Sequence, residues 1–288
     1  MKGITGVIIG AVIVVGAVLG TLWYQQSQNT EGEHKGTLYV GITDAAAGIS
    51  EVNDIELTVK KVEIYNATEG WVSVSSSDKA YKLLTLDATN KTELYAKADV
   101  AAGMYDRVRV TLGDVIVKTK SKGDVKATTP SPYVVADMMI KVNERANTFV
   151  KLDVLADQSL HVTSSGNYVF AAVVASEAKS DAQVVVAGDN SMIVSGGTVN
   201  GSVTVGVDLS GVSRAGFRLV TDNTLNVESS LTGAVKFILG GKEYTESSSA
   251  SGEASGSLNA QGSSNTDTSG GVTASTSVKV NGGVNLGY

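Results

Sequence analysis

Apolar and polar residues alternate one by one along several stretches between residues 36 and 178. From Arg107 to Leu112, for example, a valine or leucine follows each arginine or threonine. Since successive side chains of a β-strand point to opposite faces, this period of two predicts strands with one buried face. No stretch of useful length shows the helical period of 3.6. Roughly seven to nine such segments occur, which suits a two-sheet β-sandwich of immunoglobulin-like or transthyretin-like type.

The alternation also predicts which side chains face the core. They are Leu38, Val40 and Ile42, then Ile55, Leu57, Val59, Val62 and Ile64, then Val108, Val110 and Leu112, and finally Val150, Leu152 and Val154. The phase slips by one at Lys60-Lys61, which predicts a β-bulge, because one extra residue restores the buried face. Residues 168–174 are almost continuously apolar and predict a single central strand.

A different feature occupies the N-terminal end, where residues 4–24 carry no charge. At about 1.5 Å per residue, a helix of this length spans the roughly 30 Å hydrocarbon core of a membrane. Lys2 precedes the run, the aromatic pair Trp23-Tyr24 ends it, and Glu31 follows, which predicts a single-pass protein with its C-terminal bulk outside the cell. We expect a retained anchor rather than a cleaved leader, because bulky residues stand where a small-x-small cleavage site is needed.

Glycines within this run fit the small-xxx-small spacing that lets membrane helices pack closely. They are Gly6, Gly10, Gly16 and Gly20. Glycine is also common in membrane helices generally, so both a packing face and a simple anchor agree with the pattern. Lys2-Gly3 before the apolar run resembles the processing site of archaeal type IV prepilins and archaellins. This resemblance implies a filament subunit whose helix lies in the filament core.

Composition divides the chain into segments and excludes some functions. We expect an apolar helix over residues 1–24, a polar linker over 25–35, a β-sandwich domain over 36–178, a second β-rich region over 179–245 and a Gly/Ser/Thr/Asn-rich low-complexity tail over 246–288. The chain has no cysteine, which excludes disulfides, zinc–thiolate sites and a cysteine nucleophile. The formal net charge of −6 argues against nucleic acid as a partner.

Several stretches of the first β-rich region occur in a recognisable order. They are GTLYVGITDAAAGISEVNDIELTVKKVEIY (residues 36–65), LLTL (83–86), AAGMYDRVRV (101–110) and KLDVLADQSLHVTSSGNYVFAAVV (151–174). Together they resemble the prokaryotic domain of unknown function 4382. Family members often carry proline at turn positions where this chain has Ala46 and Ala101-Ala102, a departure that concerns loop shape. The resemblance implies an exported, anchored β-sandwich with no assigned activity and no catalytic residue to transfer.

Residues that could carry chemistry are few. His34 and His161 have no neighbour at metal-ligand spacing, and a lone strand histidine such as His161 is expected at a surface or edge. Asp44, which ends the first strand, is a weak calcium-ligand candidate, and a hydrogen-bonded turn residue is the alternative. Asp87, Asp153 and Asp157 share this ambiguity. No Gly-x-Ser-x-Gly motif occurs, so we expect neither enzymatic activity nor a cofactor.

Three Asn-x-Ser/Thr triplets begin at Asn66, Asn90 and Asn200 and are candidate glycosylation acceptors at expected turns. The preferred hypothesis is a non-enzymatic, membrane-anchored surface protein with a structural or adhesive role, whose partners are the lipid membrane and either itself or other surface components. A pilin-like filament subunit is the alternative. A carbohydrate- or calcium-binding module is weaker, because the sequence names no aromatic platform and no carboxylate cluster.

If residues 4–24 span the bilayer, the protein should stay with membranes after carbonate washing. Val14→Arg, at the apolar midpoint, should reduce insertion by about 2.5–3.5 kcal/mol, because a charged side chain is costly at the centre of the bilayer. Carbonate extraction followed by immunoblotting measures this. Full-length wild-type protein in a detergent-free soluble fraction would contradict the prediction.

Overall fold

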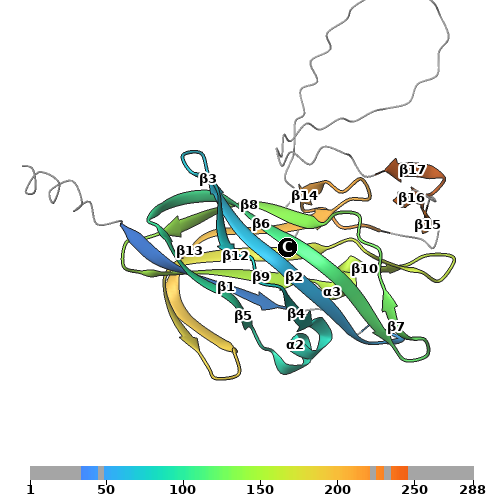
Figure 1. Ribbon diagram of the computed structural model, residues 1–288, viewed down its shortest axis with the longest axis horizontal. Coiled ribbons are helices and arrows are strands. Elements are labelled where there is room, and N and C mark those ends of the chain that lie inside the picture. Colours follow the sequence, from blue (N-terminus) through green and yellow to red (C-terminus); the bar gives the residue numbers. More distant parts are fainter. Residues whose placement is uncertain (1–33, 45–48, 221–224, 230–234, 246–288) are drawn as a thin grey trace, which may run out of the picture. The chain divides into compact units, whose positions relative to one another are not determined.

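The computed structural model describes residues 34–44, 49–220, 225–229 and 235–245, and strands make up most of them (Figure 1). The strands of the first half are β1 Lys35–Thr43, β2 Val52–Asn66, β3 Gly70–Ser75, β4 Lys79–Lys82, β5 Glu93–Ala101, β6 Gly103–Thr119, β7 Gly123–Lys126, β8 Tyr133–Val142 and β9 Asn147–Val154. Those of the second half are β10 Leu160–Val162, β11 Tyr168–Phe170, β12 Val173–Val186, β13 Met192–Val207, β14 Ser213–Ala215, β15 Leu225–Ser229, β16 Val235–Leu239 and β17 Lys242–Thr245. Two short helices are α2 Leu83–Thr89 and α3 Ala156–Ser159. The predicted all-β class is confirmed.

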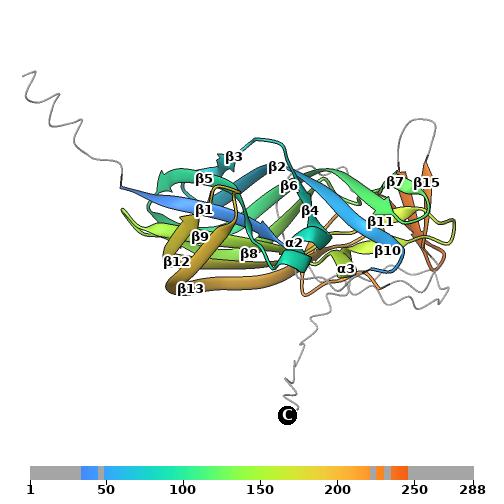
Figure 2. The ribbon, with the colours of Figure 1, turned by 90° about the horizontal axis from the view of Figure 1, so that it is seen from below.

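Two six-stranded sheets form the body of the fold and are seen as two layers in Figure 2. The first sheet has the order β14-β13-β12-β9-β1-β5, in which β1 and β9 run parallel and the other pairs are antiparallel. The second sheet is built on the antiparallel pair β2–β6. Strands β3 and β4 pair with the other edge of β2, and β7 and β8 pair with the other edge of β6.

One hydrophobic core lies between the two sheets. Every inward-facing residue predicted from the alternation is buried and belongs to this core. The predicted β-bulge is also confirmed, because the β2–β6 register shifts between Val59 and Lys61. The extra residue returns Val62 and Ile64 to the buried face, as the period of two requires.

The predicted single strand over residues 168–174 is wrong. Residues 168–170 form β11, which pairs with β10, whereas β12 begins at Val173 and belongs to the first sheet. Between them, the Ala171 N–H donates to the Ser159 carbonyl, and the Ala172 carbonyl accepts from Val207. The apolar run is continuous because both halves are buried, although the chain passes from one sheet to another.

The structure also contains a short helix that the alternation does not reveal. Helix α2 carries the LLTL stretch and buries Leu83 and Leu86. The buried carboxylate of Asp54 accepts hydrogen bonds from the Leu84 N–H at 3.1 Å and from the Thr85 hydroxyl at 2.6 Å. Seven residues are too few for a helical period to stand out in the sequence.

The domain boundary expected at residue 178 falls inside β12. Strand β12 pairs with β9 up to Ser180 and with β13 along its whole length, so residues 179–215 continue the same sheet. Val205 and Val207 of β13 belong to the same core as the predicted inward residues. The pairing partners of a strand decide which domain it belongs to, and the pairing of β12 with β9 is not visible in local composition.

Beyond Ser180, the hairpin of β12 and β13 folds over part of the outer face of the first sheet. Ala182 and Met192 pack there against Tyr39 and Phe149. The hairpin end is held by hydrogen bonds from the Met192 N–H to the Thr92 carbonyl at 2.8 Å and from the Leu94 N–H to the Asn190 carbonyl at 2.9 Å. We call residues 181–196 the arm.

A smaller sheet of β15, β16 and β17 contributes Leu225 and Phe237 to a second buried cluster with Val169, Ala171 and Leu209. No helix among the described residues is long and apolar enough to cross a membrane. The expected membrane helix with Gly6, Gly10, Gly16 and Gly20, and the expected tail over 246–288, lie outside the described residues.

A domain boundary at residue 178 predicts that a fragment of residues 34–178 folds by itself. The structure predicts instead that this fragment does not fold. It lacks β13 and half of β12, so the core loses Val205 and Val207 and exposes residues that they cover. A fragment of residues 34–245 should melt cooperatively, whereas 34–178 should show no cooperative transition by circular dichroism. A cooperative melt of the shorter fragment within a few degrees of the longer one would restore the boundary at 178.

Candidate binding surface

A continuous row of side chains crosses the outer face of the second sheet. Trp71 on β3 lies opposite Tyr65 on β2, Tyr65 opposite Arg107 on β6, and Arg107 opposite Asp137 on β8. These residues share one face because each is out of phase with the inward set of its own strand. The two rings lie 5.2 Å apart between centroids and are tilted by 55°. We call these four residues the aromatic–arginine row.

A second row lies next to it and contains a buried carboxylate. The side chain of Glu63 is 7% exposed and meets Arg109 Nε at 2.8 Å, Arg109 Nη2 at 2.7 Å and Lys61 Nζ at 2.6 Å. Burial raises the pKa of Glu63, but the hydrogen bonds and positive charges of Lys61 and Arg109 outweigh burial and hold it below its ordinary value. Glu63 is therefore a carboxylate at neutral pH.

Both arginines of the two rows stack on aromatic rings. The guanidinium carbon of Arg109 lies 4.1 Å from the Trp71 ring centroid, and that of Arg107 lies 5.0 Å from the centroid of Tyr65. Such contacts restrain both the guanidinium group and the ring. Tyr65 and Trp71 nevertheless remain half-exposed. The result is a surface of fixed, amphipathic side chains, the kind that is enriched in protein interfaces.

An open pocket of about 750 Å³ lies at one end of the aromatic–arginine row. The β2–β3 turn, the beginning of β6 and the middle of β8 line it. Met104 and Met139 are 48% and 52% exposed there, an unusual degree for methionine. Three exposed carboxylates, of Glu69, Asp106 and Asp137, also line the pocket.

The charges near the pocket are only partly compensated. Arg107 Nε lies 3.4 Å from Asp137 and 3.8 Å from Asp106. Among the residues described, Glu69 has no ion pair. The pocket therefore combines an apolar, polarisable wall with an acidic rim.

The candidate metal ligand Asp44 accepts a hydrogen bond inside the fold. It is buried at the end of β1, and its Oδ1 accepts a hydrogen bond from the Ala156 N–H, at the start of α3, at 3.2 Å. Asp153 is buried on β9, whereas Asp87 lies on α2 and Asp157 is exposed on α3. No group of three or more acidic, histidine or cysteine side chains that could hold a metal occurs within the described ranges.

The two histidines lie in different surroundings. His34 is exposed before β1 and contacts Glu144 at 2.7 Å. His161 is half-buried on β10, an edge strand that pairs with β11 in a two-stranded sheet, and its Nε2 is buried. Burial lowers the pKa of His161, and a hydrogen bond with the Gln158 backbone opposes this shift more weakly.

The three sequon asparagines stand in different settings. Asn66 begins the exposed β2–β3 turn, where its Oδ1 accepts hydrogen bonds from the N–H groups of Thr68 and Glu69. Asn90 is exposed in a left-handed conformation after α2. Asn200 lies on β13, and its Oδ1 accepts from the Ser180 N–H beside a register shift, so it takes part in the sheet rather than in a turn.

The aromatic–arginine row is not among the candidates that the sequence names. Tyr65 and Trp71 flank a short turn containing Asn66 and Gly70, and this hairpin spacing is the signal that places them side by side. Their position opposite Arg107 depends on the bulged β2–β6 register, which the sequence does not provide.

In the comparison with known proteins, one family model matches part of the chain. Residues 35–172 match the family model described as "Domain of unknown function (DUF4382)". No curated protein and no solved structure matches the chain.

Replacement of the buried carboxylate provides a pH-dependent prediction. Because the pKa of Glu63 is lowered on folding, its contribution to stability is present above the unfolded pKa near 4.5 and is lost as the pH falls through the folded value. Glu63→Gln should lower the free energy of unfolding at pH 7 by about 1.5–3 kcal/mol and flatten its loss on acidification. Chemical denaturation between pH 3 and 7 measures both effects.

Asp137→Asn is the matched control, because Asp137 is an exposed carboxylate that also faces an arginine. It should change the free energy of unfolding by less than about 1 kcal/mol. An acid transition of the Glu63→Gln variant as steep as that of the wild type would contradict the assignment.

Proposed function

We propose that this protein, in which residues 35–172 match the DUF4382 family model, is a non-enzymatic contact module with a structural or adhesive role at the cell surface. The aromatic–arginine row and the pocket beside it carry this proposal. A row of restrained aromatic and arginine side chains next to an open cavity offers a ready-made recognition surface.

The outer face of the second sheet supports recognition for an energetic reason. Side chains that are already held by stacking and ion pairs lose little conformational freedom when a partner binds. Arg109 is fixed between Glu63 and Trp71, and Arg107 lies between Tyr65 and Asp137. A partner that covers Trp71 and Tyr65 therefore meets a pre-organised surface.

The place of action is proposed from the N-terminal sequence. The uncharged run of residues 4–24, with Lys2 before it, supports a single-pass anchor that holds the β-rich bulk outside the cell. The finer description of the fold as an immunoglobulin-like or transthyretin-like sandwich is part of the same proposal, since sandwiches of this kind are common in cell-surface domains.

Two alternatives make different demands on the protein. A pilin-like subunit rests on Lys2-Gly3 and the helix glycines, and mass analysis of the mature N-terminus separates it from the anchor through cleavage after Gly3. One observation supports the alternative of a carbohydrate-binding module: the half-exposed, adjacent rings of Tyr65 and Trp71 offer an aromatic surface that is not evident from the sequence.

Adhesion between cells tests the proposed function. Cells that express the full chain should retain partner cells or isolated envelopes of the same strain, and the chain should be cleaved by protease added outside. Trp71→Ala should reduce retention about tenfold, because removal of a central aromatic anchor costs 1 kcal/mol or more of binding free energy. Retention is counted by microscopy after washing at equal surface expression.

Ile193→Ser is the control, since Ile193 is 67% exposed but lies on the arm, outside the proposed surface. It should leave retention unchanged. Equal retention by wild type and Trp71→Ala, or a β-rich region that external protease cannot reach in intact cells, would refute the proposal.

A further inference from the structure

The pocket beside the aromatic–arginine row has an acidic rim that the described residues leave open to a basic partner. Glu69, Asp106 and Asp137 line it, no basic residue does, and Arg107 compensates the latter two from its edge. Between the carboxylates, the half-exposed Met104 and Met139 offer adaptable apolar contacts. The complementary occupant is therefore a narrow segment with two or more cationic groups on aliphatic stems.

The chain itself carries such a segment. The turn between β6 and β7 contains Lys120, Ser121 and Lys122, all exposed. Lys118 before it is paired with Glu56 at 3.1 Å and lies 3.9 Å from Asp124, but neither Lys120 nor Lys122 forms an ion pair with a described residue. The Lys120 N–H donates to the Glu51 carbonyl at 3.1 Å, which holds the backbone of the turn in place. We call residues 118–124 the lysine turn.

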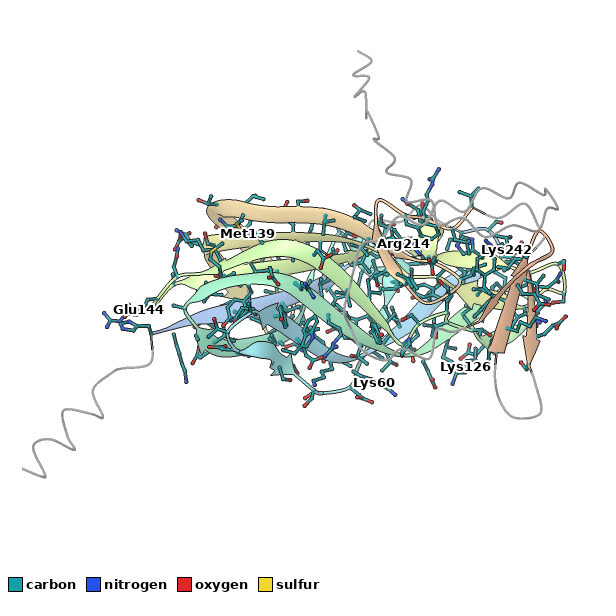
Figure 3. The ribbon with its side chains drawn as sticks, turned by 90° about the horizontal axis from the view of Figure 1, so that it is seen from above. Lys60, Lys126, Met139, Glu144, Arg214 and Lys242 are labelled. Carbon is teal, nitrogen blue, oxygen red and sulfur yellow. The ribbon has the colours of Figure 1, made fainter. Side chains whose placement is uncertain are left out.

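The acidic pocket and the lysine turn lie at opposite ends of one strand. Strand β6 begins with the pocket residues Gly103–Asp106 and ends at Thr119, just before Lys120. Its 17 residues separate the two sites by about 50 Å. The views agree with this arrangement: β3 and β7 lie toward opposite ends of the second sheet in Figures 1 and 2, and Met139 and Lys126 lie apart in the same sense in Figure 3.

We propose that the lysine turn of one copy inserts into the acidic pocket of a second copy, so that the protein associates head to tail. One molecule cannot satisfy its own pocket across this distance, and the two patches are different, so the contact is heterologous. A heterologous contact leaves a free pocket at one end and a free turn at the other, and chains grow from it unless they close into a ring. This inference rests on the proposed structural role and identifies its partner as a second copy.

Charge complementarity implies how this contact should behave. Exposed ion pairs are individually weak and are screened by salt. The fraction of associated protein should therefore be largest at low ionic strength and at high local concentration, as on a membrane surface. It should weaken at least about tenfold between 0.02 M and 0.5 M salt.

Cross-linking of the full chain in mild detergent tests the contact directly. A zero-length carbodiimide joins a lysine ammonium to a carboxylate only when they touch, so Lys120 or Lys122 should become linked to Glu69, Asp106 or Asp137. Because the two sites lie about 50 Å apart within one molecule, every such link is intermolecular. Peptide mass spectrometry identifies it, and a ladder of dimers, trimers and longer species should accompany it.

Charge reversal at each end gives a sharper result. Glu69→Lys removes the pocket while keeping the turn, and Lys120→Glu with Lys122→Glu removes the turn while keeping the pocket. Each variant alone should sediment as a monomer. Mixed one to one, the two variants should form dimers and no longer chains, because each pair has only one intact pocket and one intact lysine turn.

Lys82→Glu is the matched control, since Lys82 is an exposed lysine on β4 outside both patches. It should associate as the wild type does. Monomers in every sample, absence of the cross-link, or a mixture that still forms long chains would overturn the proposal. Loss of self-association together with intact Trp71-dependent adhesion would refute this inference and leave the proposed function standing.

Discussion

The pairing of β2 with β6 determines most of what the second sheet can do. Its register places Val62 opposite Val110 and Ile64 opposite Val108 on the buried side, and Glu63 opposite Arg109 and Tyr65 opposite Arg107 on the outer side. A slip of one residue would turn each of these sets to the wrong face. The bulge near Lys61 is therefore part of the surface as much as of the core, because it sets the phase in which both rows emerge.

The charged network in this surface has a cost that its geometry offsets. A carboxylate as buried as Glu63 is unfavourable unless cations and hydrogen bonds replace the lost water. Arg109 supplies two contacts and Lys61 a third, while the ring of Trp71 covers the guanidinium from the other side. The network thus restrains the aromatic ring, and loosening the charges would also release the surface that we propose for recognition.

The sequence predicts the strand interiors well because a period of two is local information. The burial of Leu38, Ile64 and Val154 follows from their own neighbours in the chain. The strand predicted over 168–174 is wrong, and the boundary expected at 178 falls inside β12, because strand partners distant in sequence decide where β12 begins and to which sheet it belongs. The candidate site shares this dependence: Trp71 and Asp137 are 66 positions apart in the chain (137 − 71), and three cross-strand pairings join them in one row. Helix α2 is too short for periodicity and takes shape around the buried Asp54.

The two sheets differ in how much of their outer faces they leave open, and this difference decides which one can serve recognition. The arm covers part of the first sheet, where Ala182 and Met192 bury Tyr39 and Phe149. Those two aromatic rings are buried against the arm, so the burial of their surface contributes to folding stability and is not available to a partner. On the second sheet no described segment covers Tyr65 and Trp71, although charged neighbours restrain both. The exposed parts of Tyr65 and Trp71 are apolar surface whose burial by a partner would contribute favourably to the binding free energy. This favours the outer face of the second sheet as the contact face.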